Sequence, residues 1–283
     1  MKELVFRVAQ STDYSHIKSL SASVWSHDYL IDFFIEILND PKSHFLVVEN
    51  ESHEILGCIN AVIYTFNGTR IGYLESLRVR ADVHNQGLGT DLTVKAIQYL
   101  KSNQISQIGY VTGLQNEKST QIALKSGFTR VARWPAAFID CTQLPSLEQR
   151  PSHSSELSNT EILFLIEKSE VIWYNCHWEF FPPSLSLIDH LRRDNKGIFL
   201  HSEDKSLVSF INQYEDRLVG NVLGTPTKTA ILDILTQITA LYDLKEFEEV
   251  RLFVQEKDQT FYSTMPFMDF SLKKGLLFFL KED

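Results

Sequence analysis

Cysteine is scarce in this chain of 283 residues. Cys58, Cys141 and Cys176 are few, odd in number and far apart, so they indicate neither a disulfide framework nor a zinc cluster. A reducing cytoplasm suits such a chain best, and we expect no bound metal.

Long apolar runs and runs of one charge are also missing. No stretch is apolar for long enough to span a bilayer, and MKELVFRVAQSTD at the start alternates like a strand instead of resembling a signal peptide. The formal net charge is −9 without a lysine- or arginine-rich run, whereas nucleic-acid binding needs a cationic surface. We therefore expect a soluble, cytoplasmic protein with no membrane and no nucleic-acid partner.

Composition and pattern indicate a globular protein with room for two domains. Hydrophobic residues make up 43% and charged residues 22% of the chain, as in ordinary soluble proteins. The first half predicts a strand, two helices, three antiparallel strands, a helix, a strand, a helix and a final pair of strands. The antiparallel strands fall at 44–50, 55–66 and 70–80, and the final pair at 128–134 and 136–140.

The second half partly repeats the first. Residues 110–128 can be laid over residues 252–270, and a polar stretch rich in serine and proline separates the halves. The expected fold class is therefore α/β (α+β), with two tandem domains, each a mixed, mainly antiparallel sheet flanked by helices. The predicted boundaries are 1–142 for a catalytic domain, 143–158 for a linker and 159–283 for a degenerate second copy.

Gly87 and Gly89 stand one residue apart, just ahead of a run with helical spacing. A glycine turn that leads into a helix N-terminus presents several backbone N–H groups to a phosphate, although a tight strand-to-helix turn explains the pair equally well. A dinucleotide fingerprint would need a small residue at Leu92, and a Walker loop would need a lysine in Gly89-Thr90-Asp91. Both kinds of loop are excluded.

The loop and its surroundings resemble motif A of the GNAT superfamily of acetyl-CoA-dependent N-acetyltransferases. The matching positions are Leu77-Arg78-Val79, the spacing from His84 to Gly89, and downstream Asn116, Ser119, Ile122, Lys125 and Gly127-Phe128. More narrowly, the words DYL, LESLRV and WEFFPP and the break at Asp40-Pro41 resemble the histidine N-acetyltransferase-like group, whose members carry a degenerate second domain.

The resemblance implies a site for acetyl-CoA. Its pantetheine arm would lie between the strands at 77–79 and 110–112, its pyrophosphate on the amides of 86–90, and its 3′-phosphate near Arg78, Arg80 or Lys118. The predicted cofactor residues are Leu77, Arg78, Val79, His84, Asn85, Gln86, Gly87, Leu88, Gly89, Thr90, Asn116 and Ser119. The chain departs from the family at His84, where Arg or Gln is usual, and at Ala123, where many members carry a tyrosine that is a candidate acid.

Acetyl transfer requires a neutral amine, so a base must take the ammonium proton. Glu75 is the predicted base, because alternation along its strand places Tyr73, Glu75 and Leu77 on one face; His84 is the alternative. A structural ion pair of Glu75 with Arg78 or Arg130 is the competing interpretation. The N–H of Val79 is predicted to polarise the thioester carbonyl.

The acceptor is less defined than the cofactor. A dense aromatic cluster at 173–183 forms either an interdomain core or one wall of an acceptor pocket. We expect a small-molecule amine such as an amino acid, and keep open a protein or peptide N-acetyltransferase and a non-catalytic CoA-binding module. Whether the second domain shapes the site or forms a homodimer is also open.

Overall fold

The computed structural model describes the chain in ten segments, which form two compact units. The described residues are 4–25, 28–66, 68–144, 157–166, 172–175, 179–181, 184–193, 197–214, 216–270 and 274–282. The first unit contains residues 1–110, 117–130 and 279–283, and the second contains 111–116 and 131–278. The predicted linker lies mostly outside the described residues, and the functional boundaries at 142 and 159 stay a prediction.

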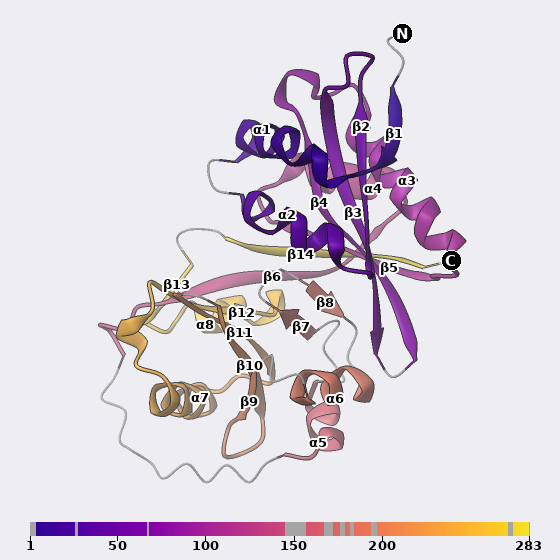
Figure 1. Ribbon diagram of the computed structural model, residues 1–283. Helices are drawn as coiled ribbons and strands as arrows, with labels where there is room; N and C mark the ends of the chain where they lie inside the picture. The colour runs from indigo at the N-terminus through magenta and orange to yellow at the C-terminus, as the bar shows by residue number, and fades with distance from the viewer. Residues whose placement is uncertain are drawn as a thin grey trace. The chain divides into compact units, whose positions relative to one another are not determined.

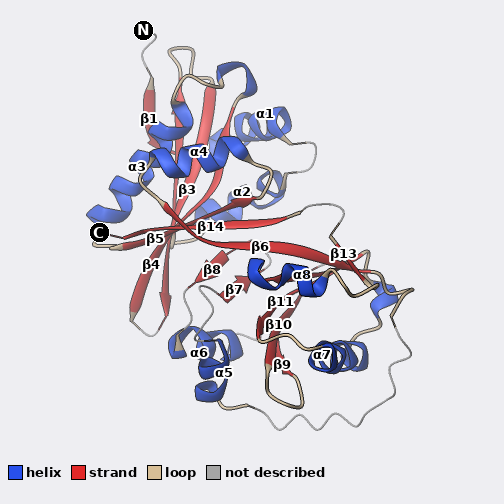
Figure 2. Ribbon diagram, turned by 180° about the vertical axis from the view of Figure 1, so that it is seen from behind, coloured by secondary structure: helices blue, strands red, loops and turns tan. Residues whose placement is uncertain are grey.

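A sheet with helices on both faces builds the first unit (Figures 1 and 2). Its elements are β1 (Val5–Val8), α1 (Tyr14–Val24), α2 (Tyr29–Asn39), β2 (Ser43–Glu49), β3 (Ile55–Phe66), β4 (Thr69–Val79), α3 (Leu88–Ser102), β5 (Gln107–Gly113) and α4 (Glu117–Lys125), with short 3-10 turns at Ser11–Asp13 and Ala81–Val83. Strands β1 to β4 pair antiparallel in chain order, and β5 joins β4 in parallel. The predicted antiparallel meander is confirmed.

Opposite faces of β3 receive different helices. Cys58 belongs to a buried cluster with Ile17 of α1 and Phe34 of α2. The neighbouring Gly57 faces α3, because a Cβ there would stand 3.0 Å from Leu92 Cδ1. Since successive residues of a strand point to opposite faces, α1 and α2 cover one face of the sheet and α3 the other.

The second unit repeats this strand arrangement. Its elements are β6 (Thr129–Ile139), α5 (Asn159–Ile166), β7 (Ile172–Asn175), β8 (Glu179–Phe181), α6 (Leu185–Arg193), β9 (Ile198–His201), β10 (Leu207–Tyr214), β11 (Arg217–Gly224), α7 (Lys228–Leu241), β12 (Glu249–Val254), α8 (Gln259–Tyr262), β13 (Met268–Asp269) and β14 (Gly275–Glu282), with 3-10 turns at Leu244–Glu246 and Glu256–Asp258. Strands β9, β10 and β11 are antiparallel, and β12 joins β11 in parallel. This is the order of β2 to β5.

Helix α7 follows β11 as α3 follows β4, but its start differs from that of α3. Thr227 caps α7, and its hydroxyl accepts a hydrogen bond from the N–H of Ala230 at 3.1 Å. A side chain therefore caps α7, whereas α3 has no side-chain cap.

Two strands differ from the expectations. The predicted pair at 128–134 and 136–140 is one strand, β6, which runs through Pro135; proline lacks only its own N–H and is tolerated where the ladder does not need that donor. The end of β14 belongs to the first unit, where Glu282 Oε1 accepts from Gln107 Nε2 at 2.8 Å. Within the described residues, no helix is both long and apolar enough to cross a membrane.

Candidate active site

Strand β4 carries a bulge in the middle of the candidate site. Glu75 pairs with Asn60 of β3 and Arg78 pairs with Cys58, so two residues of β4 oppose the single residue between Cys58 and Asn60. Ser76 has a φ of 56°, in the left-handed region. Because Cys58 and Asn60 share a face of β3, Glu75 and Arg78 share that face of β4. The expected alternation of Tyr73, Glu75 and Leu77 is therefore wrong beyond Ser76.

The strand edge beyond the bulge is turned toward β5. Parallel pairing of β4 with β5 covers Gly72 to Leu74 in the described residues and does not extend to Val79. The N–H of Arg80 donates to Leu56 O at 2.8 Å, so the adjacent Val79 occupies a non-hydrogen-bonded position of the β3–β4 ladder. Its N–H and C=O consequently point away from β3, as a group that binds a thioester carbonyl must.

The two glycines of the loop serve different physical needs. Gly87 caps α3 with a φ of 88°, and the preceding Asn85 has a φ of 64°. At Gly89, a Cβ would stand 2.7 Å from Ile122 Cδ1, so the missing side chain lets α3 approach α4. Gly87 is therefore needed for the turn and Gly89 for packing.

Amides of the first turn of α3 form the candidate phosphate cradle. The N–H of Asp91 donates to Gly87 O at 3.0 Å, which closes the first helical turn. The N–H groups of Leu88, Gly89 and Thr90 precede this bond and have no acceptor within the helix. Asn85, Gln86 and Gly87, which precede these amides, are exposed, so the loop reaches solvent at the positive end of the helix dipole.

His84 connects the loop with β4 and α4. Its Nε2 lies 2.8 Å from Val79 O, and its Nδ1 lies 3.1 Å from Lys118 Nζ. The tautomer with its proton on Nε2 donates to the carbonyl oxygen of Val79 and accepts from Lys118 at Nδ1. The side chain thus fixes the edge of β4 and holds a lysine beside the phosphate cradle.

The three cations proposed for the 3′-phosphate have different partners. Arg78 binds both carboxylate oxygens of Asp28 at 2.8 and 2.9 Å. Arg80 binds Asp82 at 2.7 Å and lies 3.5 Å from Glu54. Lys118 instead contacts the imidazole of His84. Among the described residues, Lys118 is therefore the candidate whose charge is not directly matched by a carboxylate.

Burial and charge shift the titration of the Asp28–Arg78 pair. Asp28 has a side-chain exposure of 1% and Arg78 of 13%. Burial by itself raises the pKa of Asp28, but the hydrogen bonds and charge of Arg78 outweigh it and lower that pKa. The pKa of Arg78 is raised for the same reason, against the effect of burial. Both groups stay charged at neutral pH.

Two tyrosines approach the predicted base, and neither was predicted from the sequence. Tyr64 on β3 donates from its hydroxyl to Glu75 Oε1 at 3.1 Å. The Tyr29 hydroxyl on α2 lies 2.8 Å from Ser76 Oγ. Burial, with a smaller contribution from the charge of Glu75, raises the pKa of Tyr29 to about 12. Tyr29 therefore remains a neutral hydroxyl beside the base.

The remaining predicted residues are distributed over both units. Ser119 Oγ lies 2.6 Å from the hydroxyl of Tyr110, which joins α4 to β5. Asn116 belongs to the second unit, where its N–H donates to Gly113 O at 3.0 Å. Ala123 is fully buried in α4, so the hydroxyl that many family members place there is missing. Arg130 is exposed.

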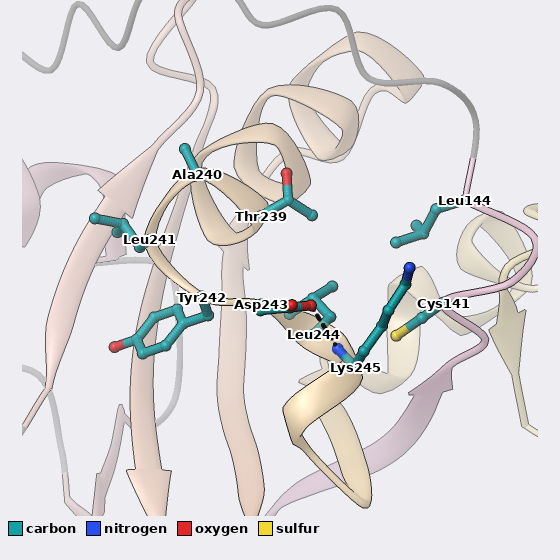
Figure 3. A pocket seen from close by; sticks show the side chains of 9 residues that line it. All are labelled: Cys141, Leu144, Thr239, Ala240, Leu241, Tyr242, Asp243, Leu244 and Lys245. Carbon is teal, nitrogen blue, oxygen red and sulfur yellow. Dashed lines mark hydrogen bonds between the residues drawn. The ribbon is translucent and has the colours of Figure 1, made fainter.

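A cavity of about 370 Å³ lies elsewhere, in the second unit (Figure 3). Its lining comes from the end of α7, the residues after it, Cys141 and Leu144. No predicted site residue lines it. Of the aromatic cluster at 173–183, Phe181 is buried, whereas His177, Trp178 and the two prolines lie outside the described residues.

Residues 10–128 match the model of the acetyltransferase (GNAT) family. A putative acetyltransferase from Thermoplasma acidophilum aligns over 99% of this chain and 100% of its own, with a TM-score of 0.63 at 16% identity. A GCN5-related N-acetyltransferase from Sphaerobacter thermophilus aligns over 99% of this chain and 95% of its own, with a TM-score of 0.61 at 13% identity. A tandem GNAT protein from the clavulanic acid biosynthesis pathway aligns over 99% of this chain and 98% of its own, with a TM-score of 0.58 at 11% identity. These likenesses extend the shared fold over both units, and no curated protein matches the chain.

Proposed function

We propose that this chain, whose residues 10–128 match the model of the acetyltransferase (GNAT) family, transfers the acetyl group of acetyl-CoA to a primary amine by direct attack in a ternary complex. Acetyl-CoA is the cosubstrate of the family. The observation that carries the proposal is the juxtaposition of an open helix N-terminus, an outward-facing backbone amide at Val79 and a carboxylate at Glu75 on one bulged strand.

The chain offers each part of acetyl-CoA a matching group. The amides of the first turn of α3 suit the pyrophosphate, and Lys118 suits the 3′-phosphate. The edge of β4 suits the pantetheine amides, because its backbone groups beyond Leu74 are not used in pairing with β5. We assign Asn116 and Ser119 to the cofactor from the family resemblance alone.

Glu75 acts as the base in the proposed mechanism. It takes a proton from the acceptor ammonium, and the amine nitrogen then attacks the thioester carbonyl carbon. The N–H of Val79 donates to the developing oxyanion. As the carbon–nitrogen bond forms, the carbon–sulfur bond breaks and CoA leaves as a thiolate. The nitrogen gives up its second proton to solvent and the thiolate takes up a proton from solvent; Ala123 supplies none.

For the acceptor we propose a small-molecule amine such as an amino acid. The support is the resemblance to the histidine N-acetyltransferase-like group. A structure described as a GCN5-related glucosamine N-acetyltransferase region of a fungal enzyme also aligns with 99% of this chain and 38% of its own, with a TM-score of 0.62 at 13% identity. A peptide acceptor is the second candidate. We also propose that the enzyme works in the cytoplasm and that residues 1–142 hold its catalytic machinery.

Calorimetric titration with acetyl-CoA, with NADH as the control ligand, tests the cofactor. Release of free thiol across a panel of amino acids, polyamines and short peptides then tests transfer and names the acceptor class. Glu75→Gln should bind acetyl-CoA as the wild type does and lose turnover, whereas Glu36→Gln, an exposed carboxylate on α2, should keep both. Binding without turnover for every amine would favour the CoA-binding module, and full activity of Glu75→Gln would exclude Glu75 as the base.

A further inference from the structure

The Asp28–Arg78 ion pair joins two segments that are 50 residues apart in the chain. Asp28 stands at the start of α2, where its Oδ1 also accepts from the N–H of Leu30 at 3.2 Å. Arg78 lies in β4, one residue before Val79, and donates from Nη1 to Leu77 O at 3.0 Å. One pair of side chains thus anchors both the first turn of α2 and the strand that carries the reacting groups.

Further contacts join the same segments. The guanidinium of Arg78 lies 5.7 Å from the centre of the Tyr29 ring, and the hydroxyl of Tyr29 lies 2.8 Å from Ser76 Oγ. Behind the bulge, Cys58 Sγ contacts Ser76 O at 3.5 Å. Ser76 is held in a left-handed conformation that serine adopts at a cost. Surrounding contacts must maintain such a conformation: Tyr29 and Cys58 contact Ser76 directly, and Arg78 contacts Leu77 O beside it.

We propose that the Asp28–Arg78 pair is a positioning element for acetyl transfer. It holds the bulge of β4 in the form that aims Glu75 at the acceptor and the N–H of Val79 at the thioester. The inference rests on the proposed function. It also reassigns Arg78, because a guanidinium committed to a buried carboxylate through two hydrogen bonds is not available to a cofactor phosphate.

Charge-removing variants that preserve shape test the proposal. Asp28→Asn keeps a side-chain oxygen for the N–H of Leu30, and Arg78→Met keeps an apolar stem. Removing one member of a buried pair leaves the other unpaired and can unfold the protein. The double variant leaves no unpaired charge. It therefore replaces a single variant in the comparison with the wild type if that single variant does not fold.

We expect each folded variant to lower kcat by about tenfold or more, because small displacements of reacting groups are costly. The KM for acetyl-CoA should stay within about twofold, and the double variant should be no slower than the slower single variant, as for residues that act as a unit. The preference for acetyl-CoA over 3′-dephospho-acetyl-CoA should be that of the wild type.

Arg7→Met is the matched control, since Arg7 forms a comparable ion pair with Asp13 and Glu49 at 2.7 and 2.6 Å, away from β4. It should lower the Tm and leave kcat unchanged at temperatures well below that Tm.

A kcat within twofold of wild type in the folded double variant would overturn the positioning role. A raised KM for acetyl-CoA in Arg78→Met alone, with loss of the preference for the 3′-phosphate, would assign Arg78 to the cofactor instead. Absence of thiol release from the wild type would overturn the proposed function, and the inference with it.

Discussion

The imidazole Nε2 of His84 lies 2.8 Å from the carbonyl oxygen of Val79. This bond connects the loop that we propose for the pyrophosphate with the strand edge that we propose for the thioester. His84 thus contacts the backbone at Val79 and also Lys118, whose Nζ lies 3.1 Å from Nδ1.

Replacing His84 by alanine should weaken acetyl-CoA binding. The variant loses one hydrogen bond to Val79 O and releases Lys118, and each net hydrogen bond contributes about 1 kcal/mol, so Kd should rise about five- to thirtyfold. Calorimetry with acetyl-CoA measures the change. His53→Ala is the control, because His53 is 85% exposed and its partner is Glu49. Equal affinity of the two variants for acetyl-CoA would show that His84 does not contribute to cofactor binding.

Gly87 should tolerate asparagine better than alanine. Its φ of 88° is costly for residues with a Cβ, and asparagine enters this region more readily than alanine. Alanine should destabilise the loop by about 1 kcal/mol and raise the KM for acetyl-CoA. Steady-state kinetics of the two variants check the order. An alanine variant that matches the wild type would show that the conformation of the turn does not matter.

The ion pairs of Arg7 should make the stability of the fold depend on pH in the acidic range. Hydrogen bonds from Arg7 lower the pKa of Glu49. Burial by itself raises the pKa of Asp13, but the bonds from Arg7 outweigh it and lower that pKa. Carboxylates with a depressed folded pKa stabilise the fold above their unfolded pKa of about 4, and this contribution is lost as pH falls through the folded value.

At pH 7 the free energy of unfolding of the wild type should therefore exceed that of the Arg7→Met variant. The difference between the two proteins should shrink below about pH 4. Urea unfolding at a series of pH values measures it. A difference that does not change with pH would mean that packing of the Arg7 stem, and not its charge, stabilises this region.

Cys58 should resist alkylation in the native protein. It is fully buried, and burial raises the pKa of its thiol to about 12, so almost no thiolate is present at neutral pH. Cys141 is half-buried and should react with iodoacetamide before Cys58. Peptide mass spectrometry after labelling, with and without urea, distinguishes them. Rapid native labelling of Cys58 would reveal local opening at the bulge of β4.

Local pattern was enough to predict part of this molecule. Alternation and turn residues predicted the antiparallel strands β2 to β4, and the glycine spacing predicted the start of α3. The bulge at Ser76 was not predictable, because a serine with positive φ leaves no mark in an alternating pattern. The approach of Asp28 and Tyr29 to β4 depends on how α2 packs, which no spacing along the chain encodes.

Tertiary pairing also determines two strands, β6 and β14, that local pattern does not describe in full. Pro135 interrupts the strand pattern in the sequence. Strand β6 nevertheless continues through it, because proline removes only one backbone N–H donor. The contribution of β14 to the first unit depends on contacts such as Lys281 Nζ to Gly127 O at 3.5 Å, whose partners lie far apart in the sequence.

That contribution of β14 has a consequence for protein synthesis. Residues 279–283 belong to the first unit, but they leave the ribosome only after the whole second unit has been made. The nascent first unit can form β1 to β5 early, yet the partner of the β5 edge, which includes Gln107 and Tyr110, is supplied last. Co-translational folding of the first unit therefore cannot finish until translation of the second unit is complete.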